Sequence, residues 1–146
     1  MRAAILAAGF VLVAGATLAG AALAGETPAP AGAELYFISP QDGATVTSPV
    51  TVRFGLKGMG VAPAGVEDKA NTGHHHLLID TEVLSGAALD EPIPADDHHK
   101  HFGGGQTETT IELTPGTHTL QLVLGDWSHI PHNPPVMSPK ITITVK

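Results

Sequence analysis

Histidine is the residue type whose number and spacing in this chain could do chemistry. The chain holds nine histidines among 146 residues, and eight of them fall into three separated groups. A neutral imidazole is the commonest metal-binding side chain, and it suits zinc, copper, iron and nickel. The pattern indicates a transition-metal site if the fold brings the groups together. The groups are His74, His75 and His76; His98, His99 and His101; and His129 and His132 with Asp126.

Short strands must position these groups, because no segment of the mature chain shows the 3.6-residue period of an amphipathic helix. Val50 to Leu56 alternates apolar and polar residues, which is typical of a half-buried strand. Strands joined by Gly/Pro turns predict an all-β fold with two packed layers. The expected strands cover residues 35–39, 49–57, 75–80, 107–113, 117–124 and 139–146.

Two stretches resemble bacterial immunoglobulin-like domains. Residues 40–54 (PQDGATVTSPVTVRF) resemble the first hairpin of those domains, and residues 113–122 (LTPGTHTLQL) resemble their penultimate corner and strand. The resemblance implies an immunoglobulin-like Greek-key β-sandwich of about seven strands, forming one domain over residues 34–146.

In such a sandwich, the loop that His74 to His76 close, the entry to strand 107–113 and the loop after strand 117–124 lie at the same end. The three histidine groups are therefore expected to meet on one rim, with His118 at the other end. We expect the metal ligands among His74, His75, His76, His101, Asp126, His129, His132, Met59 and Met137.

Several of these residues have an alternative role. Strand alternation turns either His75 or the pair His74 and His76 towards the interior, where a histidine can bond to backbone. Asp126 could instead cap its loop by accepting backbone N–H groups. His98 and His99 could be solvated loop residues, and the methionines could simply fill gaps in the core. If the thioethers do bind, they favour Cu(I), so the set fits copper best and zinc second.

The first 24 residues predict a cleaved signal peptide. Arg2 precedes an Ala/Leu/Val/Gly stretch to Leu23, and Ala22-Leu23-Ala24 is a small-residue cleavage site. A retained membrane anchor is the alternative, since the stretch approaches the ~20 residues that span a bilayer. The signal peptide would direct export to the periplasm or the extracellular space, and after cleavage the protein would have no stable membrane insertion. Residues 25–33 are expected to form a linker.

Charge and cysteine content exclude several classes of function. The formal net charge of −7 argues against nucleic acid or an anionic membrane surface as a partner. The absence of cysteine excludes thiolate metal sites and disulfides. None of the serines lies in a nucleophile-elbow context, and Gly103 to Gly105 lack the lysine of a phosphate-binding loop.

Three functions remain open from the residues. The first is a metal carrier or buffer, the second is a structural envelope module that binds a protein or glycan, and the third is a metalloenzyme. We expect the first, without enzymatic activity. Because the metal requires neutral imidazoles, its binding should weaken as the pH falls through the histidine range.

Four longer motifs resemble a family of small exported bacterial proteins catalogued as a domain of unknown function. They are GMGVAPAG (58–65), TGHHHLLID (72–80), HFGGGQTE (101–108) and HTLQLVLGDWSHIPH (118–132). The resemblance extends over about residues 34–146. It implies an envelope protein with no established activity, whose partner is unknown, and it transfers no site residues.

Overall fold

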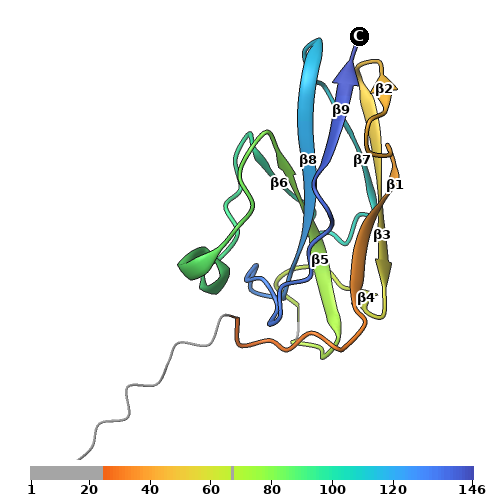
Figure 1. The fold of residues 1–146 in the computed structure, drawn as a ribbon. Coiled ribbons are helices and arrows are strands. Elements are labelled where there is room, and N and C mark those ends of the chain that lie inside the picture. The colour runs from red at the N-terminus through yellow and green to blue at the C-terminus, as the bar shows by residue number, and fades with distance from the viewer. Residues whose placement is uncertain (1–24, 67) are drawn as a thin grey trace, which may run out of the picture.

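A computed structural model describes residues 25–66 and 68–146 of the chain. The predicted signal peptide, residues 1–24, lies outside the described residues. The described chain forms two β-sheets that pack face to face, as Figure 1 shows, which confirms the predicted all-β sandwich.

The smaller sheet has the strand order β1 (Glu34–Ser39), β3 (Val50–Lys57) and β7 (Glu108–Ile111), all antiparallel. Strand β3 follows the predicted alternation, because Val50, Val52 and Phe54 are buried while the residues between them are exposed. This sheet supplies one wall of the core.

The larger sheet supplies the other wall and has the order β2-β9-β8-β5-β4, with β6 paired to β5. Strand β8 lies in its centre and pairs antiparallel with both β5 and β9. The strands are β2 (Thr45–Val46), β4 (Gly60–Val61), β5 (Thr72–Ile79), β6 (His99–His101), β8 (Gly116–Gly125) and β9 (Ile141–Val145).

All six expected strands are present, and their ends differ by at most three residues from the expected ones. The largest difference is at β5, which begins at Thr72, so His74 to His76 lie inside a strand and do not close a loop. Residues 99–101 lie outside the six expected strands but form β6. Such short strands carry too few residues to show a period, which is why β2 and β4 also escaped prediction.

The main core lies between the sheets, and a second, smaller apolar cluster lies on the outer face of the larger sheet. The second cluster contains Leu78 and Val123 of the sheet, and Ile93 and Met137 pack on them. The segment after β5, which carries Ile93, and the segment after β8, which carries Met137, therefore cover this face. The segment after β5 contains a short 3-10 helix, η1 (Gly86–Asp90). No helix among the described residues is long and apolar enough to cross a membrane.

Residues 25–33, expected as a linker, run across the lower end of the sandwich in Figure 1, where they are drawn in orange. They lie beside the loop that follows β8, since the N–H of Ala29 donates to the carbonyl of Asn133 at 2.9 Å. The carbonyl of Thr27 accepts from the N–H of Asn133 at 2.9 Å in return. This segment is therefore part of the folded domain.

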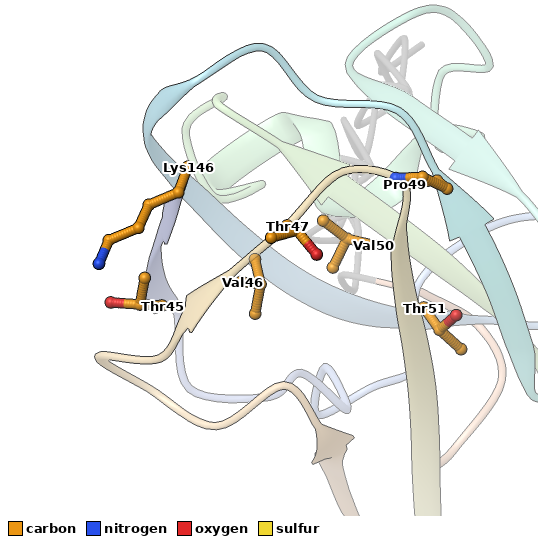
Figure 2. A pocket seen from close by; sticks show the side chains of 7 residues that line it. All are labelled: Thr45, Val46, Thr47, Pro49, Val50, Thr51 and Lys146. Carbon is orange, nitrogen blue, oxygen red and sulfur yellow. The ribbon is translucent and has the colours of Figure 1, made fainter.

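One open pocket lies at the other end of the sandwich, beside β2. Figure 2 shows the residues that line it, which are Thr45, Val46, Thr47, Pro49, Val50, Thr51 and Lys146. Its side chains are mainly threonine and valine, and Lys146 is the only titratable one among them. No histidine, aspartate or glutamate is among the residues that line this pocket, so it contains none of the expected metal ligands.

Candidate metal centre

Strand β5 separates its three consecutive histidines onto two faces. His75, Leu77 and Ile79 point into the core between the sheets, where the rings of His75 and Phe54 are 5.1 Å apart. His74 and His76 therefore point to the outer face, as alternation along a strand requires. They are nevertheless 0% and 1% exposed, because the two covering segments enclose this face as well.

Strand β6 brings the third histidine. His101 is the antiparallel partner of His76, and directly opposed residues present their side chains on the same face of a sheet. The two ring centroids are 5.0 Å apart. The pairing of β6 with β5, which joins residues 25 positions apart in the chain, thus places His101 at the group.

The loop after β8 brings the fourth histidine, His129. Its backbone has φ of 71°, in the left-handed region that is uncommon for a residue with a side chain. Two hydrogen bonds hold this conformation: the N–H of His129 donates to Asp126 O at 3.0 Å, and the N–H of Ile93 donates to His129 O at 2.9 Å. The His129 ring then lies 4.7 Å from that of His101, between centroids.

The four histidines offer ring nitrogens that all lie within 4.8 Å of one another. His74 Nε2 is 2.9 Å from His76 Nε2 and 3.2 Å from His129 Nδ1. Four nitrogens at the zinc–nitrogen distance of about 2.0–2.1 Å in a tetrahedron would be about 3.3 Å apart. The arrangement therefore fits one metal ion held by four imidazoles, which we call the four-histidine group: His74, His76, His101 and His129.

The surroundings of His74, His76 and His101 favour the neutral imidazole, which is the form that binds a metal. Desolvation, with smaller contributions from His101 and His129, lowers the pKa of His74 to about 4. Desolvation followed by the neighbouring His74 lowers the pKa of His76 to about 2. The pKa of His101 is also lowered, first by partial desolvation of its ring and then by His129. These shifts move the expected loss of metal at acid pH below the ordinary histidine range.

The far sides of the two buried rings lack partners. Nδ1 of His74 and Nδ1 of His76 are buried and make no hydrogen bond. If Nε2 of each ring faces the ion, Nδ1 must carry the ring hydrogen, and in most metal sites that hydrogen is donated to a carboxylate or carbonyl. Partners of this kind typically contribute 10–100-fold to metal affinity, so this site should release its ion more readily than one with a complete outer sphere.

Two glycines leave the space that the rings occupy. A Cβ at Gly125, the register partner of His74, would lie 2.9 Å from His76 Nε2. A Cβ at Gly103 would lie 2.4 Å from His101 Cε1. Sequence reasoning did not point to either glycine, because the need for an absent side chain is visible only once the rings are placed.

His75 lies outside the four-histidine group, although it was a candidate ligand. Its ring packs in the core against Phe54, which also contacts Phe102. Burial lowers the pKa of His75 to about 4. The backbone of Gln106 opposes this shift, but its geometry falls short of a hydrogen bond to either ring nitrogen. Alternation along β5 is the reason that His75 cannot share a face with its two neighbours.

His132 and Asp126 also lie outside the group, and both make backbone contacts. The ring nitrogens of the fully buried His132 face Thr72 O at 3.1 Å and Leu124 O at 3.4 Å. Asp126 accepts hydrogen bonds from the N–H groups of Ser128 and Ile130 at 2.9 and 3.0 Å. This is the loop cap that the sequence offered as the alternative to ligation.

The remaining candidates are placed elsewhere. Met59 packs against the main core and Met137 against the outer apolar cluster, so neither thioether joins the four-histidine group. His98 Nδ1 contacts Ile79 O, and His99 Nδ1 contacts Asp96 Oδ1, each at 2.9 Å. His118 pairs with Asp80 and Thr114 O, away from the group as expected.

Alanine at Asp126 should destabilise the domain by roughly 2–4 kcal/mol, because it leaves the N–H groups of Ser128 and Ile130 without their acceptor. Burial opposes ionisation of Asp126, but hydrogen bonds from Thr27, Ile130 and Ser128 outweigh it and lower its pKa. Urea unfolding at pH 7 measures the loss. Asp97→Ala is the matched control, since Asp97 is solvent-exposed and its one ion pair among the described residues is with Lys100 at 3.6 Å. Equal stability of the two variants would contradict the cap.

Comparison with known proteins gives a family but no activity. A family model described as "Domain of unknown function (DUF4399)" matches residues 52–146, which include all four histidines of the group. No curated protein and no solved structure matches the chain.

Proposed function

The chain belongs to the family of the domain of unknown function DUF4399, and we propose that it is an exported protein that carries or buffers one copper or zinc ion. The convergence of four ring nitrogens within 4.8 Å carries this proposal. Three separated parts of the chain, β5, β6 and the loop after β8, contribute to it. Burying the imidazoles of His74 and His76 side by side without an ion is costly, because a buried polar group without a partner loses its hydration.

The donor set favours binding over catalysis. Sites in which the protein fills all four positions are typically structural or storage sites, whereas catalytic zinc sites keep one position for water. The group contains four imidazoles and no carboxylate that could act as a general base. His74 and His76 are buried, while His101 is exposed and His129 is half-buried. An ion would enter and leave on the side of the last two.

The ion is proposed to be copper, with zinc second. This preference rests on the imidazoles and not on the methionine thioethers. With both methionines placed elsewhere, the support for Cu(I) is lost, and an all-imidazole set suits Cu(II) and Zn(II). Affinities of a given nitrogen site follow the order Cu²⁺ > Zn²⁺. The availability of each metal in the compartment to which the protein is exported then decides which ion is held.

Elemental analysis of the exported protein, purified from its native envelope without a histidine tag, tests the proposal. The expected result is about one equivalent of copper or zinc per chain, which His76→Leu removes. A metal-free protein that also refuses both ions at micromolar concentration would overturn it, and the domain would then be an interaction module for a protein or glycan. Exchange of a metal-bound water, seen spectroscopically, would favour a metalloenzyme.

Gly125→Ala should weaken metal binding by about 100-fold or more, although it adds only a methyl group. The methyl carbon would meet His76 Nε2 at 2.9 Å and push the ring from its position. Isothermal titration with Zn²⁺ and a competing chelator measures the change. Gly60→Ala is the control, because its Cβ would meet Thr72 Cγ2 at an ordinary 3.5 Å. Unchanged affinity in Gly125→Ala would show that the ion does not lie between these rings.

A further inference from the structure

Gly25, the first residue after the predicted cleavage site, is held by the folded domain. Its backbone nitrogen donates to Asp90 Oδ1 at 2.9 Å, and the residue is buried. Its φ is 57°, and a Cβ there would meet Pro131 O at 2.3 Å, so only glycine fits. The contact joins the segment 25–30, which we call the strap, to the end of η1 and to the loop after β8.

Asp90 is a carboxylate without a cation. It is half-buried, and among the described residues no lysine, arginine or histidine forms an ion pair with it. An amide N–H satisfies one of its oxygens but does not balance its charge. A positively charged donor at the position of the Gly25 nitrogen would do both, since charge-assisted hydrogen bonds are about twice as strong as neutral ones.

We propose that the amino group created at Gly25 by removal of the leader is bound by Asp90, and that this ion pair locks the strap over the loop that carries His129. An export peptidase hydrolyses the Ala24–Gly25 amide with one water molecule. Ala24 leaves with the carboxylate, and Gly25 keeps the amine, which takes up a proton. The cut thus supplies the cation that Asp90 lacks.

The strap acts on the four-histidine group through the loop after β8. Thr27 Oγ donates to Asp126 Oδ2 at 2.7 Å, and Asp126 holds the turn that gives His129 its left-handed backbone. Asn133, at the far end of this loop, exchanges two backbone hydrogen bonds with the strap. Gly25 and Asp90 are therefore positioning groups for His129, a consequence that rests on the proposed function, whereas the ion pair itself does not.

The first test needs no metal. Mass spectrometry of the exported protein should find Gly25 as its first residue. NMR titration of the metal-free protein should then place the pKa of the α-amino group about half a unit to one unit above its ordinary ~7.7–8.0. Asp90→Asn, which keeps an oxygen acceptor, should return this pKa to the ordinary range. Glu91→Gln is the control, because it removes the adjacent charge without touching Gly25, and should change it little.

The other titratable groups beside the strap are Glu26, Glu91, Asp126 and His132, and none of them contacts the Gly25 nitrogen. A different first residue, or an ordinary α-amino pKa in the unaltered protein, would overturn the ion pair.

In the second test, Asp90→Asn should speed metal release by up to about tenfold, the lower end of the range for outer-sphere partners. Unchanged release would overturn the link to His129. A raised α-amino pKa in a protein that binds no metal would overturn only the proposed function.

Discussion

Asparagine at His129 is expected to weaken metal binding by about 100- to 1,000-fold while leaving the fold intact. Structural zinc sites gain roughly 10–16 kcal/mol on binding, so one ligand of four accounts for about a quarter of that. Asparagine is the appropriate replacement because it tolerates the left-handed backbone that this position requires, with φ of 71°. Zn²⁺ and Cu²⁺ titration against a chelator of known affinity measures the loss.

His99→Asn is the matched control for this experiment. His99 lies in β6 two residues before His101, but its ring contacts Asp96 and does not reach the four-histidine group. It should keep the affinity of the unaltered protein. His132→Asn adds a second comparison, since His132 faces Thr72 O and Leu124 O and should lose stability in the metal-free state without a matching loss of affinity. If His132→Asn and His99→Asn weaken binding as much as His129→Asn, the group is assigned wrongly.

The sandwich could be predicted because its regular strands obey simple periodicity. In β3, the buried and exposed residues alternate, and one-sided burial makes the pattern visible in the sequence. β5 was harder, because its last seven residues are all buried and both faces are covered. The start of such a strand cannot be read from polarity, which explains why the strand was expected to begin at residue 75 and not at Thr72.

The candidate site was predicted at the level of clusters but not of individual side chains. All four members of the group were among the expected ligands, because a strand, a short strand and a loop each carry histidines towards one end. Which of His74, His75 and His76 face together depends on which face of β5 meets the core, and alternation alone leaves both choices open. The exclusion of His132 and Asp126 depends on backbone acceptors and donors that only the folded loop defines.

The metal-free domain is expected to unfold as the pH falls from about 5 to about 4, because three buried histidines become protonated on unfolding. Three buried histidines resist protonation in the folded state: His74 and His75, with pKa values of about 4, and His76, with a pKa of about 2. In the unfolded chain, the same groups take up protons at the ordinary pKa of ~6.5. Acid therefore favours the unfolded state.

The direction and size of this effect follow from linkage. Because the folded pKa is depressed, the stabilisation is complete above pH 6.5 and is lost as the pH falls towards the folded values. At pH 4, each of the three histidines costs about 3 kcal/mol, at 1.36 kcal/mol per pKa unit. Together they are comparable with the 5–15 kcal/mol that typically stabilises a domain. A bound ion adds stability to the folded state alone, so the loaded protein should unfold at a lower pH than the metal-free one.

His75→Phe separates the core contribution from that of the metal centre. The ring of His75 has two buried nitrogens without hydrogen bonds and packs at a tilt against Phe54, so an apolar ring should be tolerated and should remove one acid-sensitive group. Circular dichroism of the metal-free variant should show that the midpoint of acid unfolding has moved to lower pH. Its metal affinity at pH 7 should stay within about threefold of that of the unaltered protein, because His75 faces away from the ion. A large loss of affinity would place His75 among the ligands. An unchanged acid midpoint with unchanged affinity would mean that protonation of the core histidine does not drive acid unfolding, and that the outer-face pair His74 and His76 carries it.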